Sequence, residues 1–176
     1  RDRIVWIGDS ITHGFTSLLG RGLCQQAMDL ATMRDYHATN TGAASQLQSG
    51  QSAGQFTPYI ISGGRSIAHV FSGTNDIAAN ASAATVIGLT SALCTALKAG
   101  GFHKVIVGTM LPRTASFSGG RTAGDFETQR LLYNASLQAN FATYADGLAD
   151  YGSHAIMGLV ASCADTALYA DGPHPT

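Results

Sequence analysis

Residues 3–8 read RIVWIG and residues 104–108 read KVIVG, and each is a short apolar run that ends in glycine. Runs of this length and ending are typical of strands buried on both faces of a parallel sheet. Residues 66–71 (SIAHVF) form a third candidate strand, whereas residues 37–40 and 155–159 are weaker ones. We therefore expect a sheet of about five strands.

Helical patterns separate these runs. Apolar residues recur at helical spacing in residues 16–33, 81–99 and about 125–145, and glycine-rich stretches at 42–54 and 116–124 are loop-like. Strands that alternate with helices predict βαβ units and a mostly parallel sheet covered on both faces. Ligands bind such sheets beyond the carboxyl ends of the strands.

Length and composition limit the classes of function. The 176 residues predict a single domain, residues 1–176, and no interdomain linker is visible. The net charge is −1, only 12% of residues are charged, and no block of Lys or Arg occurs, which argues against nucleic acid or an anionic membrane as partner. The apolar runs are far shorter than the ~20 residues that span a bilayer, so no membrane insertion is expected.

The start of the chain and the three cysteines bear on the location of the protein and on its disulfide state. The chain begins at Arg1, as a mature form, a trimmed version or an excised domain would, and its low charge and many Ser and Thr favour an extracytoplasmic or secreted protein. Cys24, Cys94 and Cys163 are odd in number and widely spaced, which indicates neither a metal motif nor a disulfide framework. One disulfide with one free thiol, and three buried thiols, are both compatible with this spacing.

Three polar segments carry the candidate chemistry. Residues 8–12 (GDSIT) and 73–77 (GTNDI) follow two of the predicted strands, and residues 171–176 (DGPHPT) end the chain. Because parallel strands end at the same edge of a sheet, the first two segments can face each other, and the third can fold back onto them.

The residue types in these segments suit acyl transfer. A serine hydroxyl needs a neighbouring base, usually a histidine whose tautomer is fixed by a carboxylate. Ser10 follows a strand at a predicted helix start, and Asp171 and His174 are close enough in sequence to bond locally. The Asn75 amide would be a donor for the oxyanion of the tetrahedral intermediate.

The segments also resemble the four sequence blocks of the SGNH (GDSL-type) serine hydrolases, in the family order and across essentially the whole chain. Residues 8–12, 40–42 (NTG), 73–76 and 171–174 correspond to the first to last blocks. The resemblance implies a flavodoxin-like, three-layer α/β/α sandwich that requires no metal and no cofactor. This chain departs from the family in lacking the second glycine of block two and the helix that usually follows the histidine.

The resemblance also implies a role for each matching residue. Ser10 would be the nucleophile, His174 the general base and Asp171 its partner. The oxyanion hole would combine the Ser10 and Gly42 backbone N–H groups with the Asn75 side chain.

Simpler interpretations of the same residues compete with these roles. Ser10 could cap a helix, Asn75 could be a turn residue, and Asp165 could replace Asp171 as the partner of His174. Asp9 is better interpreted as a structural residue that bonds nearby backbone amides than as a catalytic one.

We therefore expect a serine esterase that forms an acyl-enzyme on Ser10. Its substrate would be a small-molecule or glycan ester with a short acyl group, such as an acetyl ester of a carbohydrate. The alternatives are a lipase, lysophospholipase or thioesterase, a non-catalytic carbohydrate-binding module, and a phosphate or nucleotide binder. The sequence does not indicate the oligomeric state.

Overall fold

In the part of the chain that the structure describes, five parallel strands form one sheet in the order β2-β1-β3-β4-β5. This computed structural model describes residues 2–13, 36–40 and 53–176, so the predicted helix at 16–33, Cys24 and Gly42 lie outside the described residues. The predicted mostly parallel sheet of about five strands is confirmed. The strands are β1 (Asp2–Gly8), β2 (Tyr36–Asn40), β3 (Arg65–Phe71), β4 (Lys104–Gly108) and β5 (Gly147–Ala149).

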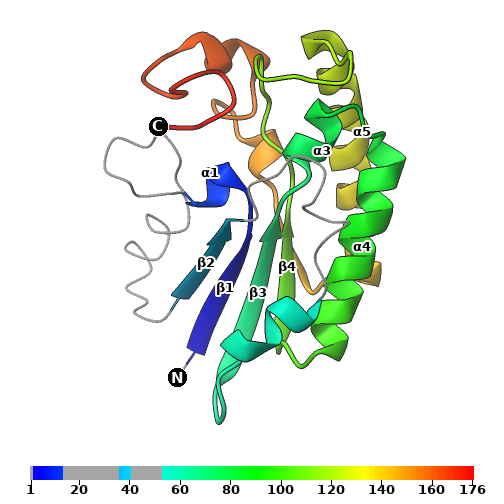
Figure 1. Cartoon of the computed structure of the whole chain (residues 1–176), viewed down its shortest axis with the longest axis vertical. Coiled ribbons are helices and arrows are strands. Elements are labelled where there is room, and N and C mark those ends of the chain that lie inside the picture. Colours follow the sequence, from blue (N-terminus) through cyan, green and yellow to red (C-terminus); the bar gives the residue numbers. More distant parts are fainter. Residues whose placement is uncertain (1, 14–35, 41–52) are drawn as a thin grey trace.

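One face of the sheet packs against two long helices, α4 (Ala83–Ala99) and α5 (Ala123–Asn140), which lie side by side in Figure 1. Alternate residues of the central strands face these helices, because successive side chains of a strand point to opposite faces. These strand residues are at most 1% exposed: Val5, Ile7, Ala68, Val70, Val105 and Val107. They share a core with apolar residues of the two helices, which include Val86, Leu93, Leu97, Phe126, Tyr133 and Leu137.

Both helices begin at a side-chain cap. The Ser82 hydroxyl accepts a hydrogen bond from Thr85 N, and the Thr122 hydroxyl accepts one from Asp125 N. Such caps satisfy backbone N–H groups that have no partner within the helix.

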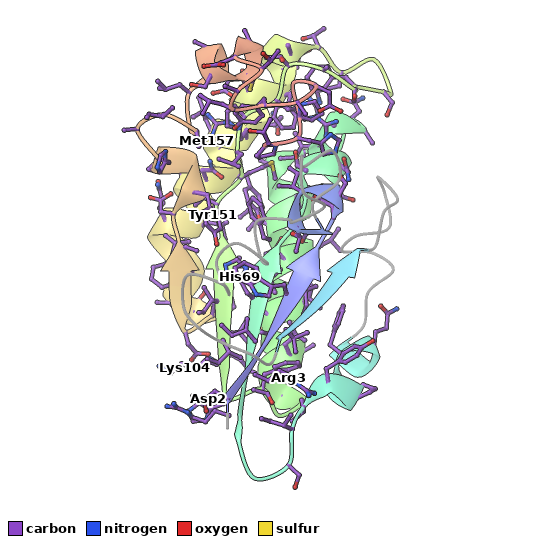
Figure 2. The ribbon with its side chains drawn as sticks, turned by 90° about the vertical axis from the view of Figure 1, so that its left-hand side faces the viewer. Asp2, Arg3, His69, Lys104, Tyr151 and Met157 are labelled. Atoms are coloured by element: carbon purple, nitrogen blue, oxygen red, sulfur yellow. The ribbon has the colours of Figure 1, made fainter. Side chains whose placement is uncertain are left out.

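The other face of the sheet carries aromatic side chains. The Trp6 and His69 rings lie 4.2 Å apart, and Tyr151 Oη lies 3.0 Å from His69 Nε2. Figure 2 shows His69 and Tyr151 on this side, with Met157 near the carboxyl ends of the strands. Burial lowers the pKa of His69 to about 4, so this histidine is neutral at pH 7.

Two expected boundaries are wrong. The last strand is Gly147–Ala149, not residues 155–159, where the chain turns and leaves Ile156 and Leu159 about half exposed. The sequence alone does not distinguish a short exposed apolar run from a buried strand. Helix α5 ends at Asn140 rather than near residue 145, because the chain tightens into a 3-10 turn at Phe141–Thr143.

Two further observations concern the described residues alone. Cys94 and Cys163 are free thiols. Within residues 2–13, 36–40 and 53–176, no helix has the length and apolar character that a transmembrane span needs.

Candidate active site

The segment after β1 places Ser10 at the carboxyl edge of the sheet. Ser10 begins the short helix α1 (Ser10–His13), directly after Gly8 and Asp9. Gly8 makes this tight exit possible: a Cβ atom there would lie 2.0 Å from Thr12 Oγ1 and 2.4 Å from the Phe71 carbonyl oxygen. Any side chain at this position would push α1 away from β3.

Ser10 is hydrogen-bonded to the end of the chain. Its Oγ lies 2.8 Å from His174 Nε2, across 164 positions of sequence. Figure 1 shows the C-terminus folded back beside α1. The structure thus brings together the first and last of the predicted segments.

The Asp171 carboxylate orients the His174 ring. His174 Nδ1 lies 2.8 Å and 2.9 Å from the two Asp171 carboxylate oxygens, and His174 N donates to Asp171 Oδ1 over 3.1 Å. Because an ionised carboxylate only accepts, Nδ1 carries the hydrogen, and Nε2 of the neutral ring is free to accept the Ser10 proton. Asp165, the other candidate partner, instead accepts a bond from Ala167 N.

The turn that carries this pair is closed by its own backbone. Ala170 N donates to the His174 carbonyl over 2.8 Å, and Tyr169 forms an antiparallel bridge with Pro175. Gly172 has a φ of +89°, a left-handed conformation that favours glycine. Thus the spacing of Asp171 and His174 is set locally.

Asn75 lies at the end of the neighbouring strand. It belongs to the short helix α3 (Thr74–Ala78), which begins after the two residues that follow β3, and β3 pairs with β1 so that Phe71 lies opposite Gly8. Gly73 has a φ of +102° and allows the chain to turn sharply into α3. The Asn75 side-chain oxygen accepts a hydrogen bond of 3.1 Å from Arg113 Nη1.

The second predicted block begins at this edge as well. Its first residue, Asn40, ends β2 and lies opposite Gly8 in the register of the sheet. Gly42, its predicted oxyanion donor, lies outside the described residues.

Two buried carboxyl groups lie close to the site. Burial raises the pKa of Asp9 to about 6, although its bond from Ile11 N and the charge of Arg113 oppose the rise. Burial also raises the pKa of Asp76 to about 6, and the charge of Asp9 adds to that rise. The bond between Asp9 and the Ile11 backbone confirms that Asp9 binds a nearby amide, as expected.

Arg113 is the residue that sequence reasoning missed. It follows the carboxyl end of β4, at the same edge as Ser10 and Asn75, and only 5% of its surface is exposed. Its position just beyond a predicted strand is the signal that could have found it. Its burial could not be read from the sequence, because arginines are mostly exposed.

The described residues hold no group of three or more His, Cys, Asp or Glu side chains that could bind a metal ion. The arrangement that the structure does contain is a hydroxyl, an imidazole and a carboxylate joined by hydrogen bonds.

Solved structures share this architecture. A member of the lipolytic G-D-S-L family from Veillonella parvula matches 100% of this chain and 90% of its own length, with a TM-score of 0.73 and 19% identity. A GDSL-like lipase from Bacteroides thetaiotaomicron matches 99% of this chain and 80% of its own, with a TM-score of 0.62 and 19% identity. An acetyl xylan esterase matches 84% of this chain and 76% of its own, with a TM-score of 0.50 and 16% identity.

A scan of protein-family models and a search of curated proteins give no match. The identities to these three solved structures are low, so the likeness concerns the fold. The α/β fold expected from the four sequence blocks is confirmed.

Proposed function

We propose that this chain, which has the fold of the SGNH (GDSL-type) hydrolases, is a serine esterase that uses Ser10, His174 and Asp171. The observation that carries the proposal is the continuous hydrogen-bonded path from Ser10 Oγ through the His174 ring to the Asp171 carboxylate. A helix cap would not need a histidine 164 positions away on its hydroxyl.

The geometry supports a two-step reaction. His174 Nε2 takes the Ser10 proton as Oγ attacks the ester carbonyl carbon and forms a tetrahedral oxyanion. As the carbon–oxygen bond to the alcohol breaks, His174 returns the proton to the leaving alcohol, and Ser10 remains acylated. A water molecule, deprotonated by His174, then attacks the acyl carbonyl carbon, and the bond from this carbon to Ser10 Oγ breaks, which releases the acid. His174 returns the proton to Oγ and so restores the free serine.

Donors around the oxyanion complete the proposal. The Ser10 N–H and the Asn75 side-chain NH₂ would bind the developing negative charge, and removal of one such donor typically lowers kcat by about 10²–10³-fold. Gly42 remains a predicted third donor.

A short acyl group is the substrate that we favour. A cavity of about 10 Å³ lies among residues next to the nucleophile and at the ends of β3 and β4, including Asp9, Ile11, Phe71 and Leu111. This volume corresponds to about one water molecule and suits a methyl group better than a long chain. The likeness to an acetyl xylan esterase supports acetyl esters of carbohydrates as the first substrates to test.

One observation favours a longer acyl chain. Ile156, Leu159 and Val160 are 40–54% exposed, and their neighbour Met157 packs against the Ile11, Phe71 and Leu111 cluster. A lipase, lysophospholipase or thioesterase would use such an apolar surface. Hydrolysis of nitrophenyl esters from two to twelve carbons separates the two classes, and a preference for eight or more carbons would exclude the acetyl proposal.

Labelling with a fluorophosphonate tests the nucleophile. Ser10 Oγ would attack phosphorus and displace fluoride, so intact mass should show one adduct on the wild type and none on Ser10→Ala. Ser91→Ala is a matched control, because the Ser91 hydroxyl donates to the Gly88 carbonyl on the exposed side of α4. No adduct on folded wild-type protein would contradict the proposal and favour the non-catalytic binding module.

A further inference from the structure

We propose that Arg113 is a positioning residue that holds the Asn75 amide in the orientation needed for the oxyanion. This inference rests on the proposed function, because it assigns Arg113 a task in the same reaction. The contact that carries it is the 3.1 Å hydrogen bond from Arg113 Nη1 to Asn75 Oδ1.

The chemistry of the two groups fixes the direction of the amide. A guanidinium has only donors, whereas a side-chain amide has an accepting oxygen at one end and a donating NH₂ at the other. If the Asn75 amide rotated by half a turn, its NH₂ would face the Arg113 N–H groups, and two donors would meet. The Arg113 contact therefore keeps the Asn75 oxygen on the Arg113 side and leaves its NH₂ to face the substrate.

Several further contacts hold the Arg113 guanidinium in place. Its Nε donates to the Ala115 carbonyl over 3.0 Å, and its Nη2 donates to the Ser116 carbonyl over 2.9 Å. The guanidinium carbon also lies 5.7 Å and 5.9 Å from the centres of the Phe117 and Phe126 rings. With 5% of the residue exposed, the guanidinium has little freedom to leave Asn75.

The backbone of this loop is strained at one of these contacts. Ser116 has a φ of +62°, a left-handed conformation that residues other than glycine rarely adopt. Strain of this kind persists where the surroundings hold the backbone in place, and it is common near functional sites. The Arg113 bond to the Ser116 carbonyl is one such restraint.

The charge of Arg113 also acts on the donor strength of Asn75. A hydrogen bond to the amide oxygen polarises the amide, which makes its NH₂ a stronger donor. Asp9 and Asp171 carry the nearby opposite charges. Burial lowers the pKa of Arg113, and these two carboxylates oppose the fall, so the guanidinium stays charged at neutral pH.

A purely structural role is the competing explanation. A Cβ atom on Gly172 would lie 2.9 Å from Thr114 Oγ1 and 3.3 Å from Ala115 Cβ, so the loop that Arg113 braces lies against the turn of Asp171 and His174. Loss of Arg113 could then disturb the base rather than Asn75. A double-mutant cycle separates the two, because a residue that acts only through Asn75 has nothing further to lose once Asn75 is gone.

The experiment measures kcat and KM with nitrophenyl acetate for the wild type, Asn75→Ala, Arg113→Met and the double variant. We expect about 10²–10³-fold lower kcat for Asn75→Ala. Because Arg113→Met keeps the amide but frees its orientation, we expect it to lose about 10–100-fold, with KM within about twofold. The double variant should lie within about threefold of Asn75→Ala. Multiplied losses in the double variant, or an unchanged kcat in Arg113→Met, would overturn the proposal.

Arg121→Met is the matched control. Arg121 also bridges two carbonyls near α3, those of Ile77 and Ala81, but it does not bond Asn75. Its kcat should stay within about twofold of the wild type.

A milder variant covers the case in which Arg113→Met does not fold. Arg113→Lys keeps the charge, but a compact ammonium lacks the planar fork of donors with which Arg113 bonds Asn75 and both carbonyls. We expect about three- to tenfold lower kcat, and this loss should vanish in the Asn75→Ala background. Full activity of Arg113→Lys, or the same loss in both backgrounds, would count against the positioning role.

Measuring Ser10→Ala in the same assay distinguishes the two proposals. If Ser10→Ala keeps its activity, the serine esterase proposal fails. If Ser10→Ala and Asn75→Ala lose activity but Arg113→Met does not, the esterase proposal stands and the positioning role alone fails.

Discussion

Replacement of Asp171 by asparagine tests the electrostatic part of the site, because it keeps the size of the side chain and removes its charge. Both carboxylate oxygens of Asp171 lie within 2.9 Å of His174 Nδ1. An asparagine NH₂ can donate to Nδ1 and so favour the tautomer with its hydrogen on Nε2. That tautomer cannot accept the Ser10 proton.

The size of the effect follows from the exposure of the carboxylate. Where the aspartate of a serine protease triad is buried, this replacement lowers kcat by about 10⁴-fold. The Asp171 side chain is 42% exposed, so solvent can partly replace its charge. The loss of one charge-assisted hydrogen bond, about 1.5–3 kcal/mol, is about 10–200-fold in rate. With the tautomer penalty, we expect about 10²–10³-fold lower kcat.

The assay is hydrolysis of nitrophenyl acetate, with fluorophosphonate labelling rates as a second readout. Asp165→Asn is the control, since Asp165 bonds the Ala167 backbone rather than His174. If Asp171→Asn kept more than about a third of the wild-type kcat, or if Asp165→Asn lost as much, the assignment of Asp171 as the partner of His174 would be wrong.

Two further changes test the surroundings of the nucleophile. Gly8→Ala should lower the free energy of unfolding by about 1–3 kcal/mol in urea titrations and reduce labelling of Ser10, because its Cβ atom would overlap the Phe71 carbonyl; unchanged stability would refute the close packing. Folding raises the pKa of Asp9 from 3.8 to about 6. Between pH 3.8 and about 6 the folded protein therefore binds more protons than the unfolded protein, and the contribution of Asp9 to stability falls as the pH rises. Asp9→Asn should remove up to about 3 kcal/mol of that fall, because one pKa unit corresponds to about 1.4 kcal/mol, and identical urea midpoints against pH for both proteins would show that Asp9 is not desolvated.

Much of the fold could be predicted because the inner strands are apolar on both faces. Residues 66–71 and 104–108 match β3 and β4 closely, since a short run of mostly apolar residues is typical of a buried strand. Strand β5 has only three residues at the edge of the sheet, and its position depends on pairing with β4 that no local pattern indicates. The strand expected at residues 155–159 was wrong because the exposure of apolar residues such as Ile156 cannot be predicted from a local pattern.

The candidate site was predictable where its residues bond within one segment or follow a strand. Asp171 and His174 lie three positions apart, so their contact could be expected from sequence. Arg113 is buried and bonds three oxygen atoms on two separate segments. These contacts form only once the chain has folded, so no local pattern indicates them.

The self-contained turn of Asp171 and His174 has a consequence for how the site could be switched. Because the turn is closed by the bond from Ala170 to His174 and by the Tyr169–Pro175 bridge, it can shift as a rigid unit without breaking its own contacts. Such a shift would lengthen the distance from Ser10 to His174 and move Gly172 relative to Thr114 and Ala115, but it would leave the acid–base pair intact. In the proposed mechanism, the distance between the nucleophile and its base therefore depends on how closely this turn packs against α1.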